Sequence, residues 1–488
     1  MTRQIGNDVE YRASVKGCWL GKAIGGTLGG PFEGEAGPLD VAFYTPVPTQ
    51  SLPNDDLDLQ VVWAFVIDKL DRPRVDREVL VDAWLDHVGY YPDEYGVAIR
   101  NLQSGLRPPL TGSYDNWFVH GMGGAIRTEI WACLSPGDPR LAASYAYEDA
   151  CVDHDGEGIW AAVFLASLES LAFAESDRER LLDESLKLLP EASAVRRAIQ
   201  DTRVWWEKRR DWRAVRELIL RRYGHENFTD VTANLAFIVL GWLAGDRDFG
   251  RAICIATNCG RDTDCTAATL GALLGILHPS EIPPEWVAPI GEELVLSPSI
   301  RGVEPRPGML DEFTNLVVDL RRRIGGCYPP APTEHRQSTD HLAITVYSAF
   351  TDGDLLEQKV PPAPEMTRPV PMRLPGTLAR LPREAFRGDA LLLRYRFALP
   401  RPLRARVMFN TRQRCRVWVD GRFAFGREGG RMAPSPHRVP RDQSIDLDLA
   451  AGGHELLAAI ARPDDLMAEW VVGVADGGLH CWLPNVFQ

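Results

Sequence analysis

The sequence predicts a multi-domain chain in which an all-α helical bundle is followed by an all-β sandwich or jelly roll. The 488 residues exceed what one ordinary hydrophobic core organises. Apolar residues recur with helical spacing from about Tyr11 to Ile324, whereas short apolar runs alternate with turn signals from Leu342 onward. We therefore expect a helical domain at 1–326, a linker at 327–341 and a β-sandwich accessory domain at 342–488.

The helical part contains four segments that are apolar on nearly every face, as expected of helices buried inside a large bundle. Charge-laced amphipathic stretches such as Asp177–Leu188 lie between them, and we expect these on the outside. Small residues such as Gly271 would let a neighbouring backbone approach closely. The four apolar segments are Asp58–Leu70, Ile159–Phe173, Thr232–Leu243 and Cys265–Leu277.

The pattern changes at Gly325-Gly326, where the helical periodicity ends. Cys327–Gln337 is rich in proline and polar residues, which is typical of a linker. Six or more strand-like runs follow, and the Asp420-Gly421 pair predicts a β-hairpin over Arg416–Phe425. Three tryptophans of this part could form a sugar-binding face, although packing inside the sandwich is their commoner fate: Trp418, Trp470 and Trp482.

Composition narrows the classes of function. The formal net charge is −13, which argues against a chain that coats nucleic acid or an anionic membrane. None of the nine cysteines forms a CxxC pair, so no zinc knuckle or redox dithiol is indicated, and a reducing, cytoplasmic setting is expected. We find neither an apolar signal-peptide core in Met1–Lys16 nor a run long enough to span a membrane.

Two acidic clusters stand at the starts of apolar helical segments. The first is 53–58 (PNDDLD) and the second is 258–264 (NCGRDTD). Helix capping alone would explain either cluster, because Asn54 is a good N-cap and carboxylates favour a first turn. Carboxylates so close to a core are nevertheless costly unless a positive charge neutralises them. Oxygen-rich sites without histidine favour Mg²⁺, with Mn²⁺ as the alternative.

Five segments, in the same order along the chain, resemble the ADP-ribosylglycohydrolase family. Asn54-Asp55-Asp56 is similar to the family's Thr-Asp-Asp segment, and Gly260–Ala268 (GRDTDCTAA) is similar to its Gly-x-Asp-Thr-Asp-Thr signature. Gly17–Gly34 resembles the N-terminal glycine-rich segment that ends in a glutamate. Gly121–Ile130 and Glu148–His154 resemble two later segments. The resemblance covers roughly residues 11–324 and excludes the β-rich tail.

This resemblance implies an orthogonal helical bundle that hydrolyses a glycosidic bond of an ADP-ribosyl group with Mg²⁺, in a binuclear site that grips the ribose diol. The substrate would be a protein-linked or small-molecule ADP-ribose. Glu33, Asp55 and Asp264 are the expected catalytic residues, with Asp264 bridging the ions and Glu33 acting as general acid or base. The expected metal ligands are Asn54, Asp55, Asp56, Asp262, Asp264 and Thr266.

Three positions depart from the family pattern. Asn54 replaces a threonine, but its carbonyl oxygen can still bind a hard ion. Cys265 stands where the family has a ligating threonine, and a thiol is a poor ligand for Mg²⁺. Thr266 could replace it through a shift of the helix start, water could fill the place, or one metal site could be weaker. Leu57 replaces a second threonine. We expect these changes to alter the substrate rather than abolish catalysis.

Substrate contacts are expected from a glycine turn, a histidine and a tryptophan. The backbone of Gly121, Gly123 and Gly124 could approach a diphosphate, although a capping turn explains these glycines equally well. His154 could line the cleft or cap a loop. Arg127 could reach a phosphate, but a structural ion pair is the commoner fate of such an arginine. Trp117 could stack on a base or sugar, with core packing as the alternative.

Two other functions compete with ADP-ribosyl hydrolysis. The same metal site could act on a different riboside or glycoside, which the changes at Leu57 and Cys265 and the appended β module favour. A non-catalytic ligand-binding relative is the third reading, and the retained carboxylates weigh against it.

Overall fold

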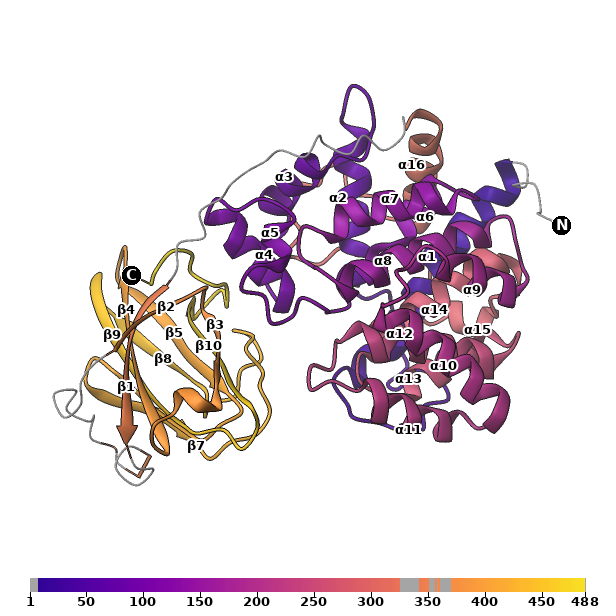
Figure 1. Ribbon diagram of the computed structural model, residues 1–488. Helices are drawn as coiled ribbons and strands as arrows, with labels where there is room; N and C mark the ends of the chain where they lie inside the picture. The colour runs from indigo at the N-terminus through magenta and orange to yellow at the C-terminus, as the bar shows by residue number, and fades with distance from the viewer. Residues whose placement is uncertain (1–7, 325–341, 351–355, 358, 360–369, 488) are drawn as a thin grey trace. The chain divides into compact units, whose positions relative to one another are not determined.

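The computed structural model describes residues 8–324, 342–350, 356–357, 359 and 370–487 (Figure 1). The chain forms two compact units, each made of two segments. Unit 1 comprises Met1–Tyr90 with Phe118–Thr333, and unit 2 comprises Tyr91–Trp117 with Glu334–Gln488. The predicted linker at 327–341 lies outside the described residues. None of the described helices combines the length and the apolar character that crossing a lipid bilayer requires.

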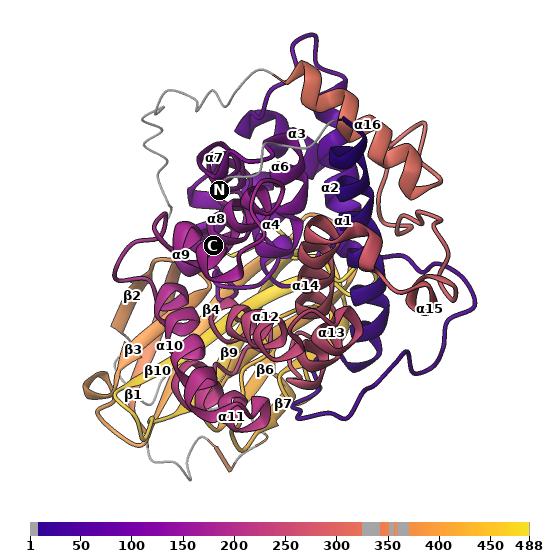
Figure 2. The ribbon, with the colours of Figure 1, turned by 90° about the vertical axis from the view of Figure 1, so that its right-hand side faces the viewer.

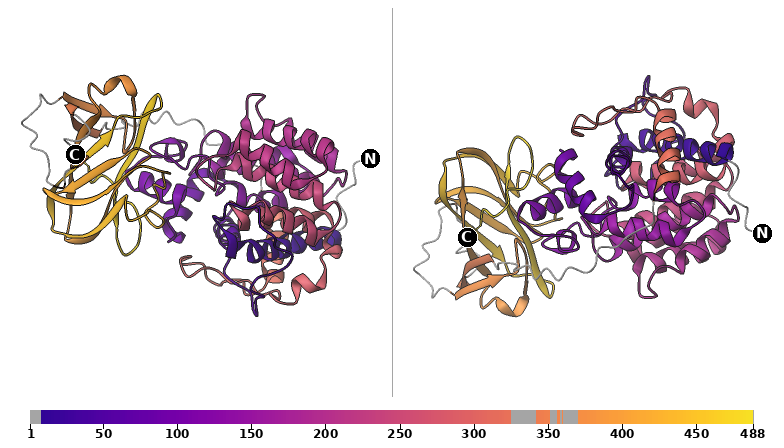
Figure 3. Two further views of the ribbon diagram at one scale, coloured as in Figure 1. Left: turned by 90° about the horizontal axis from the view of Figure 1, so that it is seen from below. Right: turned by 90° about the horizontal axis from the view of Figure 1, so that it is seen from above.

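Unit 1 is helical (Figure 3). The longer helices are α1 (Asp8–Gly29), α2 (Asp55–Asp68), α3 (Arg77–His87), α7 (Pro139–Ala150), α8 (Glu157–Ala172), α9 (Arg178–Leu186), α10 (Ala194–Arg209), α11 (Trp212–Tyr223), α12 (Val231–Gly245), α13 (Phe249–Asn258), α14 (Thr263–Leu277) and α16 (Leu310–Arg323). Shorter turns are η1 (Gly30–Phe32), η2 (Ala125–Arg127), α6 (Glu129–Leu134), η3 (Pro279–Glu281) and α15 (Pro284–Val287).

The four segments predicted as buried helices are confirmed, because they form most of α2, α8, α12 and α14. Every residue of α12 is buried, and so are all residues of α14 except Asp264. A helix with apolar residues on every face has no surface suited to water, so it occupies the centre of the bundle. The amphipathic stretch predicted for the outside forms α9, whose charged residues Arg178, Glu179 and Asp183 reach solvent.

The C-terminal half of α1, from Gly17 to Gly29, lies along α14, and the two helices run antiparallel (Figure 2). Glycines make this approach possible: a Cβ added to Gly21 would overlap the backbone of Gly271, and a Cβ on Gly29 would overlap the backbone of Thr263. Only residues without side chains let two helix backbones come so close. The packing therefore brings the C-terminal end of α1 to the N-terminal end of α14.

Unit 2 contains two antiparallel sheets. The six-stranded sheet has the order β2-β1-β4-β9-β6-β7, and the four-stranded sheet has the order β3-β10-β5-β8. The strands are β1 (Leu342–Phe350), β2 (Val370–Leu374), β3 (Leu378–Pro382), β4 (Ala390–Leu399), β5 (Leu403–Thr411), β6 (Cys415–Val419), β7 (Arg422–Arg427), β8 (Ser444–Leu449), β9 (Gly452–Ala461) and β10 (Met467–Asp476), with the short turn η5 (Arg383–Ala385) before β4.

One face of each sheet contributes to a shared hydrophobic core, which confirms the predicted sandwich. The predicted hairpin is also confirmed, since β6 and β7 pair across Asp420 and Gly421, both with positive φ. Trp418, Trp470 and Trp482 are buried, and the indole of Trp470 donates a hydrogen bond to the Tyr395 hydroxyl at 2.6 Å. Packing rather than sugar binding accounts for these tryptophans.

Two helices from the first third of the chain belong to unit 2. They are α4 (Asp93–Gln103) and α5 (Leu110–Ser113). Val97 of α4 joins Met408 and Val471 in an apolar cluster on the outer face of the four-stranded sheet. An ion pair between Arg100 and Asp115, at 3.1 Å, links α4 to the residues that follow α5. The prediction of a helical domain at 1–326 includes this 91–117 segment, whereas the structure groups it with the strands.

Candidate metal centre

Three helix ends meet in unit 1: the C-terminal end of α1 and the N-terminal ends of α2 and α14. The side-chain amide of Asn54, at the start of α2, lies against Gly26 of α1 and donates to the Lys22 carbonyl at 3.5 Å. The Thr263 hydroxyl, at the start of α14, donates to the Gly29 carbonyl at 2.8 Å. The partial positive charge of the two N-termini suits anionic side chains at this junction.

The junction brings the two acidic clusters together, although they are far apart in sequence. A carboxylate oxygen of Asp262, one of Asp264 and the sulfur of Cys265 lie within 4.8 Å of one another. Burial raises the pKa of Asp264 well above its ordinary value, and the charge of Asp262 followed by those of Glu33, Asp56 and Asp55 raises it further. The charges of the first acidic cluster thus act on a carboxyl group of the second.

These carboxylates are buried and poorly compensated. Asp56 is 1% exposed and Asp262 is 2% exposed. Among the described residues, no group donates a hydrogen bond of normal geometry to either carboxyl oxygen of Asp56, to Oδ2 of Asp262 or to Oδ1 of Asp264. Burial raises the pKa of Asp56 to about 7 even though Lys22 opposes the rise. Orphaned buried carboxylate oxygens are a donor set that fits a hard divalent cation.

Other predicted ligands have partners within their own helices. Oδ1 of Asn54 caps α2 by accepting a hydrogen bond from the Asp56 backbone N–H at 2.9 Å. The buried hydroxyl of Thr266 donates to the Thr263 carbonyl at 3.2 Å. The sulfur of Cys265 lies in a cluster with carboxylate oxygens of Asp262 and Asp264. The third acidic side chain of the first cluster, Asp58, accepts a hydrogen bond from the Ser297 backbone at 3.1 Å and so faces a different loop.

Glu33 lies at the exposed edge of this centre. It follows η1, where its backbone N–H donates to the Gly30 carbonyl, and the next residue bonds the Arg261 carbonyl at 2.8 Å. The charge of Glu33 raises the pKa of Asp262, after the larger effect of burial. The structure therefore places an exposed carboxylate beside the buried ones.

Sequence reasoning missed Lys22, which supplies a buried positive charge behind the carboxylates. Its ammonium is completely buried and lies 2.7 Å from Glu129 and 3.9 Å from Asp56. The Gln60 side chain holds Glu129 in place by donating to its other oxygen at 2.8 Å. Burial by itself would lower the pKa of Lys22, but Glu129 and then Asp56 outweigh it and raise the pKa. The sequence feature that could have indicated this role is a lysine among the glycines of an otherwise apolar helical segment.

A buried network of ion pairs around Arg127 supports the turn that contains Gly121, Gly123 and Gly124. Arg127 binds Asp149 at 3.0 Å and Asp153 at 2.7 Å, and it also donates to the Gly123 carbonyl at 2.7 Å. This confirms the structural ion pair as the role of Arg127. Nδ1 of the fully buried His154 lies 2.8 Å from Asp153, and its Nε2 accepts a hydrogen bond from the Gly124 N–H at 3.3 Å.

These bonds bear on the predicted substrate contacts. The N–H of Gly121 donates to the Phe118 carbonyl at 2.7 Å, and that of Gly124 donates to His154. Neither amide is thus available to a diphosphate in this structure, because each carries a single hydrogen. Any role of His154 in substrate binding would act through the turn that it holds. Trp117 belongs to unit 2, where it packs against the apolar cluster on the four-stranded sheet.

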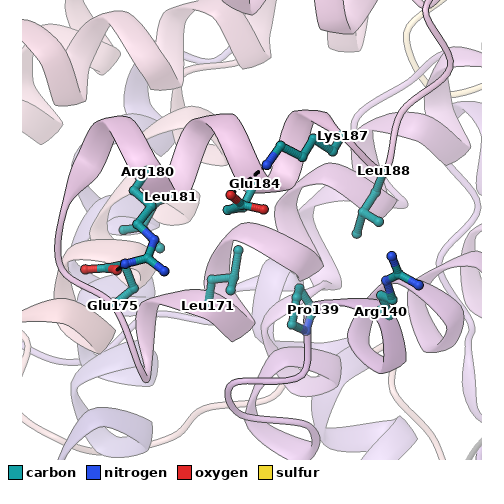
Figure 4. Close-up of a pocket in the computed structure, with 9 residues that line it drawn as sticks. All are labelled: Pro139, Arg140, Leu171, Glu175, Arg180, Leu181, Glu184, Lys187 and Leu188. Carbon is teal, nitrogen blue, oxygen red and sulfur yellow. Dashed lines mark hydrogen bonds and ion pairs between the residues drawn. The ribbon is translucent and has the colours of Figure 1, made fainter. Parts of the chain in front are cut away.

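A surface pocket of about 250 Å³ lies elsewhere in unit 1, where α9 faces the start of α7 and the end of α8 (Figure 4). Its charged residues largely neutralise one another, since Arg180 pairs with Glu175 at 2.9 Å and Lys187 with Glu184 at 2.7 Å. None of its lining residues belongs to the predicted site. The pocket therefore offers no alternative to the acidic junction.

A family model agrees with the resemblance seen in the motifs. A family model described as ADP-ribosylglycohydrolase matches residues 7–322. A solved structure titled "ADP-ribosylglycohydrolase-related protein complex" has 20% sequence identity and a TM-score of 0.47, covering 64% of this chain and 99% of its own. The search of curated proteins gave no match.

Proposed function

This chain belongs to the ADP-ribosylglycohydrolase family, and from that premise we propose that it is a metal-dependent hydrolase that cleaves the glycosidic bond of an ADP-ribosyl group. The group would be carried by a protein side chain or by a small molecule. One observation carries the proposal: carboxylate oxygens of Asp262 and Asp264 lie within 4.8 Å of each other, and these residues and Asp56, whose charge acts on both, have buried carboxylate oxygens that lack hydrogen-bond donors. Such a cluster is unfavourable by itself and becomes favourable with bound cations.

Asn54, Asp55, Asp56, Asp262 and Asp264 would hold the cations, with Mg²⁺ favoured and Mn²⁺ as the alternative, and Thr266 would assist only if its hydroxyl turned away from the helix. When bound, such ions orient a ribose diol and lower the pKa of a water molecule. The chain's own contribution is rigidity. Asn54 and Thr263 tie the starts of α2 and α14 to α1, so the carboxylates keep their positions without reorganisation.

Glu33 is the residue suited to proton transfer. Its carboxyl group is exposed, so it can exchange protons with solvent, yet it lies close enough to raise the pKa of Asp262. It would take a proton from the attacking water or give one to the leaving group. The buried carboxylates cannot share this task freely, because each proton that they accept removes negative charge needed to hold a cation.

A different riboside or glycoside is the second candidate substrate. The specific observation in its favour is that the Cys265 sulfur lies where a hydroxyl would complete an oxygen-only site. A non-catalytic relative is disfavoured because the carboxylates remain. We also propose a cytoplasmic location, since all described cysteines are free thiols. Given the negative net charge, we expect neither nucleic acid nor membrane as a partner.

The test uses the purified full chain with Mg²⁺, offered ADP-ribosylated proteins and small ADP-ribosyl conjugates, with released ADP-ribose measured by chromatography. Asp262→Asn should abolish release and Glu33→Gln should reduce it. Asp177→Asn, an exposed cap of α9, is the matched control and should retain full activity. Cleavage of simple ribosides without release of ADP-ribose would establish the second candidate. No cleavage of any of these compounds by a protein that binds Mg²⁺ would contradict both.

A further inference from the structure

We propose that Cys265 is a metal ligand, so that the α14 side of the centre is a mixed oxygen and sulfur position that selects a thiophilic divalent cation such as Zn²⁺ or Co²⁺. The position around Asp55 and Asp56 remains oxygen-only and keeps its preference for Mg²⁺. This inference rests on the metal centre of the proposed function and deepens it. It assigns the two positions different chemistries because soft thiolates select different cations from hard carboxylates.

The geometry of the first turn of α14 carries this inference. One ligand atom each from Asp262, Asp264 and Cys265 falls within 4.8 Å of the others, which is the spacing of groups that share one ion. Oδ2 of Asp262 and Oδ1 of Asp264 receive no hydrogen bond of normal geometry from any described residue. Asp262 is itself 98% removed from solvent, since its exposed fraction is 2%. These orphaned oxygens point to a cation, and the sulfur lies among them.

Packing alone does not explain this cysteine. Buried free cysteines usually behave as small apolar side chains with apolar neighbours. Cys259 shows that pattern six positions earlier: it is completely buried, and besides burial the charge that affects its pKa is that of Arg216. Cys265 instead lies within 4.8 Å of a carboxylate oxygen of Asp262 and of one of Asp264. An uncharged thiol with a single weak donor hydrogen cannot neutralise such a group, whereas a divalent cation bound by the sulfur and the carboxylates can offset their charge.

Metal binding by Cys265 releases the thiol proton. The S–H bond of Cys265 breaks, the sulfur keeps the electron pair and donates it to the cation, and the proton leaves to solvent. One proton is therefore released for each thiolate ligand formed. A hydroxyl at the same position would bind as a neutral ligand and release none. The variant Cys265→Thr, which restores the family's residue, should accordingly differ from the natural chain in both metal preference and proton release.

The experiment is an anaerobic titration of the metal-free full chain with Co²⁺, followed by near-ultraviolet absorption, equilibrium dialysis and proton release. The natural chain should develop a sulfur-to-Co²⁺ charge-transfer band. Cys265→Thr should lose that band and release one proton fewer than the natural chain while still binding metal. Its affinity for Co²⁺ relative to Mg²⁺ should fall at least about tenfold, the lower bound for loss of even an outer-shell group. Cys259→Ser is the matched control, and its band should be unchanged.

The outcomes separate this inference from the proposed function. Co²⁺ that binds to the natural chain without a charge-transfer band would overturn the thiolate ligand and leave the metal centre standing. A band that survives in Cys265→Thr would also overturn it, because another cysteine would then be the source. If neither Co²⁺ nor Mg²⁺ binds to the natural chain, the metal centre itself fails and both proposals fall. Helical circular dichroism of Cys265→Thr and Cys265→Ser checks that both variants are folded.

Discussion

Replacing Lys22 by methionine should destabilise unit 1 far more than an ordinary loss of a surface charge. The Lys22 ammonium is completely buried, 2.7 Å from Glu129 and 3.9 Å from Asp56. Methionine retains the length and apolar character of the side chain but removes the charge. Removing one partner of a buried pair costs about 3–5 kcal/mol because the other charge is left buried without compensation. Here two carboxylates lose the same cation.

The loss of folding stability caused by Lys22→Met should depend on pH, and the protonation of Glu129 and Asp56 sets the direction of that dependence. Burial raises the pKa of Glu129 and of Asp56, and Lys22 lowers both, so Lys22→Met raises them further. A carboxyl group whose pKa is higher in the folded state binds more protons there than in the unfolded chain, so stability increases as pH falls through that pKa. The deficit should therefore be largest near pH 8 and shrink toward about pH 5.

The assay is urea denaturation in the presence of a chelator, followed by helical circular dichroism because most helices belong to unit 1. Lys16→Met on the same helix is the matched control: its ion pair with Glu292 is about one-third exposed and is worth about 1 kcal/mol or less. Adding Glu129→Gln to Lys22→Met should recover part of the loss. A deficit for Lys22→Met equal to that of the control, or independent of pH, would refute the reasoning.

Three further outcomes are expected. Mg²⁺ at about 100 times its Kd should stabilise the natural chain by about 2.7 kcal/mol and should not stabilise Asp262→Asn. This stabilisation should shrink below about pH 7, because burial raises the pKa of Asp56 to about 7 and a protonated Asp56 no longer attracts the cation. Equal thermal shifts in both proteins would contradict the metal assignment. Arg127→Met should cost about 3–5 kcal/mol in urea denaturation, because it leaves two buried aspartates unpaired, against about 1 kcal/mol or less for the exposed control Arg203→Met. Removing 342–488 should expose the apolar face of α4 and cause aggregation in light scattering, whereas dispersed, monomeric protein would show that α4 needs no cover.

The sequence alone determined the features that depend on neighbouring residues. The buried helices follow from apolar residues on all faces, as in 159–173, and the hairpin follows from Asp420-Gly421 with its positive φ angles. The acidic clusters were visible because carboxylates precede apolar helices, and the spacing of glycines such as Gly21 and Gly271 anticipated close helix packing. Periodicity, capping and turn chemistry act over a few residues, so they can be read directly.

Only the tertiary structure decided which distant groups meet. It buried Lys22 between Glu129 and Asp56, paired Arg127 with two buried aspartates, and placed the Cys265 sulfur beside the carboxylates of Asp262 and Asp264. It also grouped 91–117 with the strands, through contacts more than 250 residues apart in sequence, such as Tyr114 with Pro375. These outcomes depend on the rotation of each helix about its axis and on the partner that covers each apolar face, and both are set by packing of the whole chain.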